Sequence, residues 1–163
     1  MKYVGQHNIK RLCNFYVSDL HLSVMLLPYI NKQINEDVEI TTIFEKLEKE
    51  NFEAVLDKLN VKNKEKILNI NWFNGNKDTY EKIENKIEED IKNKKNITII
   101  IGGNKNYVFN NNKNIINYFN KKNIKDLEIK VINCYNIDDV KKDIKLITKQ
   151  YDGILNTSGE IKI

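Results

Sequence analysis

The chain has 163 residues, which is enough for one domain with a core that needs no disulfide or metal support. Its net charge is +4, but Arg11 is the only arginine and the lysines are mixed with Asp and Glu. This pattern is typical of a solvated surface, so we do not expect nucleic-acid binding. The chain also lacks a signal peptide's apolar core and any run of roughly 18 apolar residues, which predicts a cytoplasmic protein without a membrane span.

Five short runs rich in branched and aromatic residues predict β-strands, and they cover residues 13–18, 39–45, 66–73, 96–103 and 128–135. Segments with helical periodicity separate or follow them, at about 20–35, 50–60, 78–94, 113–122 and 137–150. Ser18 or Asp19 can cap the first helix. A last run, 153–158, could add an edge strand, with 159–163 either pairing with it as a hairpin or trailing.

The only proline, Pro28, lies inside the first helical pattern. Proline removes a backbone donor and clashes with the preceding turn. We therefore expect a kink at this position, or a helix whose strong part begins there.

Alternation of strands and helices predicts βαβ units with right-handed crossovers. The expected fold is α/β: a three-layer αβα sandwich, Rossmann-like or RecA-like, with a mainly parallel sheet of five or six strands. No linker rich in Pro, Gly or Ser divides the chain, so residues 1–163 are expected to form a single domain.

Ligands of open parallel sheets bind outside the carboxyl ends of the strands. Applied to the predicted strands, this rule selects the candidate ligand-binding residues Ser18, Asp19, His21, Glu45, Trp72, Phe73, Gly102, Gly103, Asn104 and Tyr135. Trp72 and Phe73 could line an apolar pocket, or they could pack beneath the following helix.

The sequence gives little support to any known catalytic motif. Ser18-Asp19-Leu20-His21 could begin a dinuclear phosphoesterase site, but that chemistry needs several histidines and the chain has only His7 and His21. The first strand is followed by no glycine, which excludes a dinucleotide-binding fingerprint, and no P-loop is present. Cys13 and Cys134 have no base nearby in the sequence and are expected to pack as small apolar side chains. We therefore predict no catalytic residue, metal or cofactor.

One phosphate-binding alternative stays open. The segment Gly102-Gly103-Asn104-Lys105 follows the fourth predicted strand, where backbone amides could surround an anion. A tight turn is the other interpretation of the same glycine pair. If the first holds, the chain would be a RecA-like nucleotide-binding protein, or an enzyme using Asp19, Glu45 and this loop on a phosphorylated ligand.

Residues 12–45 combine a strand containing Cys13, Phe15 and Tyr16, a short acidic turn, a leucine-rich helix broken by Pro28-Tyr29, and a second strand. This order resembles the opening of MEDS-type sensory domains, over about a fifth of the chain. The resemblance implies a RecA-like architecture without its phosphate-binding loop, which senses small molecules and signals to another domain. The family's His-x-Cys element is absent, since Arg11 stands two residues before Cys13.

Taken together, these features predict a non-enzymatic domain of bacterial signal transduction or regulation. Its expected partner is a small molecule or a regulatory protein. A homo-oligomer is also compatible with the sequence, through the last edge strand or the helix face around Met25 and Leu26.

Overall fold

The computed structural model describes residues 9–46, 49–73, 77–122, 124 and 126–162. The strands are β1 (Ile9–Tyr16), β2 (Glu39–Phe44), β3 (Asn71–Phe73), β4 (Ile97–Gly103), β5 (Ile129–Asn136), β6 (Gly153–Asn156) and β7 (Gly159–Lys162). The helices are α1 (Asp19–Asn35), α2 (Lys49–Leu59), α3 (Lys64–Leu68), α4 (Lys77–Lys92), α5 (Lys105–Asn120), α6 (Ile137–Val140) and α7 (Ile144–Thr148).

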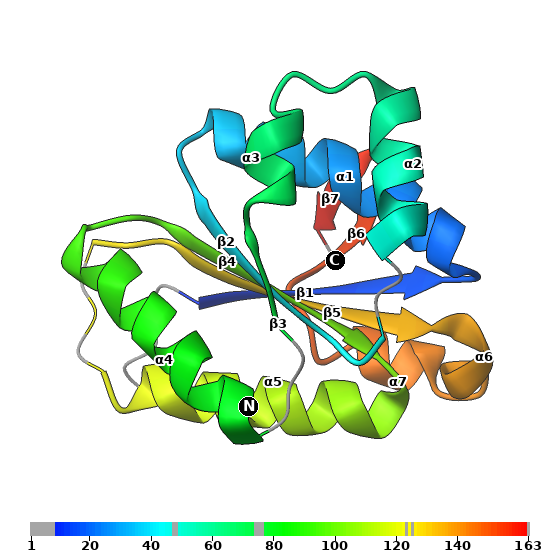
Figure 1. Ribbon diagram of the computed structural model, residues 1–163. Helices are drawn as coiled ribbons and strands as arrows, with labels where there is room; N and C mark the ends of the chain where they lie inside the picture. Colours follow the sequence, from blue (N-terminus) through cyan, green and yellow to red (C-terminus); the bar gives the residue numbers. More distant parts are fainter. Residues whose placement is uncertain (1–8, 47–48, 74–76, 123, 125, 163) are drawn as a thin grey trace.

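These strands form one sheet in the order β3-β2-β4-β5-β1-β6-β7, with helices on both faces (Figure 1). Strands β1 to β6 are parallel, and β7 runs antiparallel to β6. The predicted α/β sandwich with a mainly parallel sheet is confirmed. The sheet has seven strands in the described part of the chain, not five or six, because the final hairpin contributes two.

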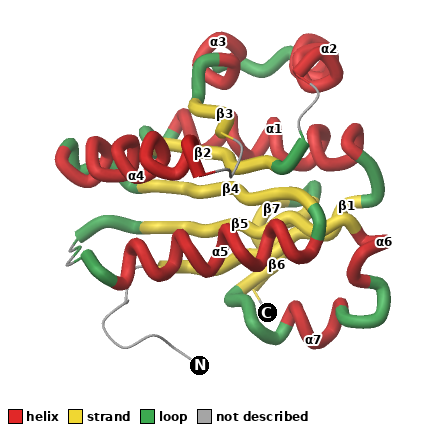
Figure 2. Tube along the Cα trace, turned by 60° about the horizontal axis from the view of Figure 1, so that its bottom comes forward, coloured by secondary structure: helices red, strands yellow, loops and turns green. Residues whose placement is uncertain are grey.

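Two hydrophobic clusters fill the space between the sheet and its helices. One lies under α1, α2 and α3 and includes Leu12 and Ile132; the other lies under α4, α5 and α7 and includes Ile99 and Val131. Figure 2 shows α2 and α3 on one side of the sheet and α5 and α7 on the other. Because β4 and β5 are buried on both faces, they appear in the sequence as nearly continuous apolar runs.

Local hydrogen bonding and packing explain where element boundaries differ from the predictions. The predicted strand 66–73 is instead α3 followed by the short β3, since Lys64–Leu68 consists of helix-forming residues with only Ile67 buried. Helix α5 begins at Lys105 rather than 113, because the Asn104 side chain caps it by accepting a bond from the Tyr107 amide. The predicted helix 137–150 is divided into α6 and α7.

Helix α1 runs without interruption from Asp19 to Asn35, so it does not begin at Pro28. Ser18 caps it, as predicted, through a bond from the His21 amide to its Oγ. Pro28 leaves the carbonyl of Val24 without a helical donor. Both residues are exposed, so water can take the place of that donor. None of the helices in the described ranges is long and apolar enough to cross a membrane.

The β6–β7 hairpin is tied to the rest of the sheet by Glu160. Its carboxylate accepts bonds from Tyr29 Oη (2.8 Å), Lys130 Nζ (2.8 Å) and Lys10 Nζ (3.1 Å). Burial alone would raise the pKa of Glu160, but the bonds from Lys130, Tyr29 and Lys10 outweigh it and lower the pKa to about 2.

Glu160→Gln is therefore expected to lower the free energy of unfolding at neutral pH. Since the folded pKa lies below the ordinary 4.5, the ionised carboxylate stabilises the fold above pH 4.5, and this contribution disappears as the pH falls toward 2. Urea unfolding at several pH values should show the difference between wild type and variant shrinking with acidity. Glu128→Gln, at an exposed position, is the control. An equal and pH-independent effect of both changes would contradict the role given to Glu160.

Candidate functional site

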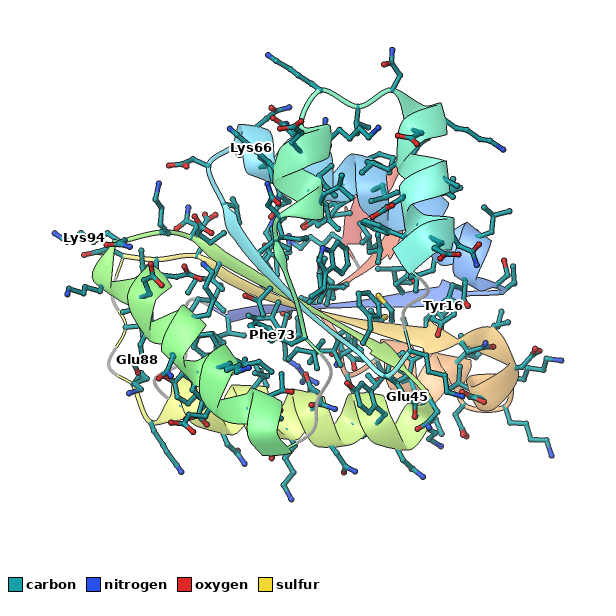
Figure 3. All side chains as sticks on the ribbon, viewed as in Figure 1. Tyr16, Glu45, Lys66, Phe73, Glu88 and Lys94 are labelled. Carbon is teal, nitrogen blue, oxygen red and sulfur yellow. The ribbon has the colours of Figure 1, made fainter. Side chains whose placement is uncertain are left out.

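At the carboxyl edge of the sheet, several neighbouring strands are followed by helices on opposite faces. The helices that follow β1 and β2 cover one face, and those that follow β4 and β5 cover the other. The neighbouring pairs β2–β4 and β5–β1 are therefore switch points, where ligands of parallel sheets bind. Figure 3 shows Tyr16 and Glu45 at this edge and Lys94 at the opposite one.

At the end of β1, the predicted site residues serve the start of α1. Ser18 is the N-cap, and Asp19 lies in the first turn. His21 Nδ1 accepts a hydrogen bond from the Val17 amide at 3.0 Å. The imidazole nitrogen that faces the backbone is thus engaged, which leaves His21 poorly placed as a general base.

At the β2–β4 switch point, the predicted site residues Glu45 and Asn104 contact each other. Glu45 accepts bonds from the Asn104 amide (3.1 Å) and the Asn104 side chain (2.6 Å). Gly103 allows this approach, because a Cβ there would lie 2.8 Å from Glu45 Cβ and 2.8 Å from the Tyr107 ring. A Cβ on Gly102 would instead lie 2.5 Å from the Phe44 ring. The carboxylate therefore occupies the donors that a phosphate would need at this loop.

The aromatic pair on β3 is divided between the two faces of the sheet. Trp72 packs against Phe44 and Phe52, and its Nε1 donates to the Ile67 carbonyl at 3.3 Å. Phe73 packs against the cluster under α4 and α5. The two rings do not line a common pocket. Trp72 packs under α2 and α3, which precede it, and only Phe73 packs on the side of the following helix α4, so neither predicted arrangement holds for both rings.

Tyr135 is fully buried rather than open at the edge. Its hydroxyl lies 2.5 Å from that of Tyr151, which also accepts a bond from Asn133 Nδ2 at 2.6 Å. Burial raises the pKa of Tyr135 above its ordinary value, and the Tyr151 contact raises it further. The structure thus places the Tyr135 side chain in an internal polar network under α5 and α7, although its backbone pairs with that of Gly103.

Neither cysteine is suited to nucleophilic chemistry. Cys13 and Cys134 are both buried and face opposite sides of the sheet, in different hydrophobic clusters. Burial raises the pKa of Cys13 to about 12 and also raises that of Cys134, so both thiols stay protonated. Among the described residues, no three His, Cys, Asp or Glu side chains are grouped so that they could hold a metal ion.

An exposed apolar row begins at the β5–β1 switch point. Val17, Leu20 and Val24 are 60%, 63% and 39% exposed, and we call them the α1 row. Carboxylates surround the same place: burial raises the pKa of Tyr16, and the charges of Asp19, Asp139 and Glu45 raise it further. The candidate residues predicted from the sequence lie at this edge but do not include the row. Its only sequence signal is spacing: Leu20 and Val24 lie four residues apart on α1, and Val17 precedes the Ser18 N-cap.

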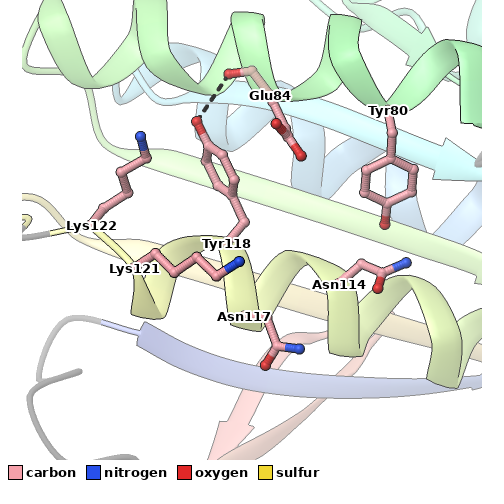
Figure 4. Close-up of a pocket in the computed structure, with 7 residues that line it drawn as sticks. All are labelled: Tyr80, Glu84, Asn114, Asn117, Tyr118, Lys121 and Lys122. Carbon is pink, nitrogen blue, oxygen red and sulfur yellow. Dashed lines mark hydrogen bonds between the residues drawn. The ribbon is translucent and has the colours of Figure 1, made fainter.

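The structure also contains a groove between α4 and α5, with a volume of about 550 Å³. It is lined by Tyr80, Glu84, Asn114, Asn117, Tyr118, Lys121 and Lys122 (Figure 4). Sequence reasoning did not find it, because its two walls come from helices that only the tertiary fold brings together. A partial signal was present in the polar and aromatic residues that recur at three- and four-residue spacing from Asn114 to Lys121.

Known proteins give no further guide to these sites. Comparisons with models of protein families, with curated proteins and with solved structures found no match to this chain.

Proposed function

We propose that this chain is a non-enzymatic domain of bacterial signal transduction or regulation that binds a protein partner at the carboxyl edge of its sheet. The observation that carries this proposal is the α1 row. Only five large apolar side chains in the described residues are exposed, and three of them, Val17, Leu20 and Val24, lie together at the β5–β1 switch point. Exposed apolar side chains that follow one another so closely in the chain are typical of an interaction site.

The chemistry around the row indicates which partner it would bind. The carboxylates of Asp19 and Asp139 are exposed and have no ion pair within the described chain, whereas the neighbouring Asp138 and Asp143 are paired with Lys141 and Lys105. Unpaired carboxylates beside an apolar surface favour a partner that presents apolar and basic side chains together. A helical row is also a convex surface, which suits a protein better than a small molecule.

Catalysis is the weaker interpretation because three of the polar side chains at the edge, Ser18, His21 and Glu45, are already bound internally. Ser18 and His21 organise the start of α1, and Glu45 is bound to Asn104. The nucleotide-binding alternative is weakened for the same reason, since the Glu45 carboxylate would repel a phosphate at the 102–105 loop. The MEDS resemblance agrees with a sensory role and stays a prediction.

The proposal can be tested with a synthetic amphipathic peptide of leucine and lysine, titrated into labelled protein and followed by NMR. We expect shifts at Val17, Leu20 and Val24, and no binding of a matched leucine and glutamate peptide. Leu20→Ser should lower the affinity for the peptide about tenfold, since burying a leucine contributes roughly 1.5–3 kcal/mol. Leu146→Ser is the matched control, because Leu146 on α7 is equally exposed at 62%.

Three results would contradict the proposal. The first is absence of binding by the leucine and lysine peptide, and the second is an equal loss of binding in the Leu20 and Leu146 variants. The third is self-association that Leu20→Ser abolishes, because it would assign the α1 row to a second copy of the chain. Binding of ATP with Mg²⁺ at the 102–105 loop would favour the nucleotide alternative, so ATP with and without Mg²⁺ belongs in the same titration series.

A further inference from the structure

The groove between α4 and α5 has walls that the protein holds in place. Tyr80 Oη donates to Asn111 Oδ1 at 3.1 Å. Tyr118 Oη lies 3.3 Å from the Glu84 carbonyl and also bonds the Glu88 carboxylate. Because both hydroxyls are bound within the protein, both rings are fixed in position, and they reach into the space between the two helices (Figure 4). The groove therefore offers two preformed aromatic surfaces.

Other groups that line the groove are free to bind a ligand. The Glu84 carboxylate on α4, the Asn117 amide on α5 and the Lys121 ammonium after α5 make no hydrogen bond or ion pair within the described residues. Figure 4 shows Glu84 and Lys121 reaching toward the gap from opposite walls. The groove thus combines an acceptor, a donor and an amide that can do both.

The charges of the groove balance. Lys122 forms an ion pair with Glu88 and lies 5.1 Å from the centre of the Tyr118 ring. One anion, Glu84, and one cation, Lys121, then remain. A phosphate would be attracted by Lys121 but repelled by Glu84, and a simple cation would meet the reverse. Only a ligand without net charge can use both groups.

We propose that this groove binds a neutral polyhydroxylated small molecule, namely a mono- or disaccharide. Each sugar hydroxyl both donates and accepts, and so matches the carboxylate, amide and ammonium together. The apolar faces of a sugar ring can lie against Tyr80 and Tyr118. The volume of about 550 Å³ falls within the range of small-molecule sites. The role of this site as the input of a sensory domain rests on the proposed function. Binding of a sugar in the groove does not depend on the α1 row.

The test is an NMR titration of the full chain with D-glucose, D-ribose and maltose, alongside inorganic phosphate as a charged probe and glycine as a zwitterionic one. We expect at least one sugar to give saturable shifts along Tyr80–Glu84 and Asn114–Lys122. A neutral ligand should keep its affinity when the ionic strength is raised, because no net charge is screened. Asn117→Ala and Lys121→Met should each weaken binding at least fivefold, and together at least tenfold.

Matched controls lie on the same helix outside the groove. Asn110→Ala and Lys113→Met replace exposed residues of the same two types and should leave sugar affinity unchanged. The inference is overturned if none of the three sugars binds saturably, if the control variants lose as much affinity as the groove variants, or if phosphate or glycine gives the same shifts in place of a sugar.

The two proposals fail separately. Leu20→Ser should leave sugar binding intact. Loss of the peptide response with sugar binding preserved would overturn only the partner surface, and a peptide response without any sugar binding would overturn only the groove.

Discussion

Lys86→Met is expected to lower the free energy of unfolding by up to about 4 kcal/mol at pH 7. Lys86 on α4 forms ion pairs with Asp90, one turn later, and with Glu39 at 3.1 Å. Asp90 is only 3% exposed; Lys86 bonds its Oδ1, and its Oδ2 has no partner in the described structure. Burial raises the pKa of Asp90, while Lys86 acts in the opposite sense. Without the ammonium, the carboxylate is left buried and unpaired, which is strongly destabilising.

Protonation of Asp90 limits this loss and makes it depend on pH. At pH 7, which is about three pH units above the ordinary aspartate pKa of 3.8, taking up a proton costs about 4 kcal/mol, since each pH unit is worth about 1.4 kcal/mol. At pH 5 the same step costs less than about 2 kcal/mol. In the variant, the raised pKa of Asp90 therefore gives stability that is present at acidic pH and is lost as the pH rises. Urea unfolding at pH 5 and pH 7 measures both values.

Two further variants separate the ion pair from general effects of the substitution. Lys82→Met removes an exposed lysine from the same helix and should change stability little. Adding Asp90→Leu to Lys86→Met removes the buried charge and should restore most of the loss, since apolar replacements of buried ion pairs are often neutral. A loss with Lys86→Met that is the same at pH 5 and pH 7 would show that Asp90 does not stay buried after the change.

The fold could be predicted because parallel strands buried on both faces have a plain sequence pattern. The runs at 96–103 and 128–135 are so rich in isoleucine and valine that only central strands explain them. The start of helix α5 was harder to predict from the sequence. Its Asn-rich first half, Lys105–Asn112, has the composition of a loop, yet Asn104 caps it and Val108 and Asn111 are buried against the sheet. Burial in the tertiary fold decided the outcome there, and composition did not.

The site could be located but not assembled from the sequence. Carboxyl ends of parallel strands meet at one edge, so the sequence could place Glu45, Gly103 and Asn104 at that edge. Their direct contact follows from the pairing of β2 with β4, which the sequence does not show. Which face a strand residue occupies is a different matter, because adjacent positions alternate. A shift of one residue would put Tyr135 on the other face of the sheet, and its packing against Phe15, Phe109 and Tyr151 fixes its face.

Gly103→Ala is expected to lower the free energy of unfolding by about 2–4 kcal/mol. Gly103 has a φ of +153°, which side-chain-bearing residues rarely adopt, and such strain costs about 1–3 kcal/mol. The new Cβ would also lie 2.8 Å from Glu45 Cβ and 2.8 Å from Tyr107 Cδ1, and overpacking of this kind costs about 1–3 kcal/mol more. Thermal and urea unfolding of the purified variant measure the sum.

Two other glycines separate these costs. Gly159 has a φ of +105°, and nothing lies within 4 Å of the position that a Cβ would occupy there, so Gly159→Ala reports backbone strain alone. Gly102 has no such φ, but its Cβ would lie 2.5 Å from the buried Phe44 ring, so Gly102→Ala reports crowding alone. We expect Gly103→Ala to exceed the Gly159 variant by the cost of its contacts with Glu45 and Tyr107.

This comparison also bears on what the glycine pair is for. If Gly103→Ala is the more destabilising change, the loop is closely packed around Glu45, and any ligand binding lost in that variant reflects the fold and not a phosphate cradle. If Gly103→Ala is no worse than Gly159→Ala, Glu45 and Tyr107 yield easily. The 102–105 loop could then open around an anion, and the nucleotide-binding alternative would gain the room that the observed packing denies it.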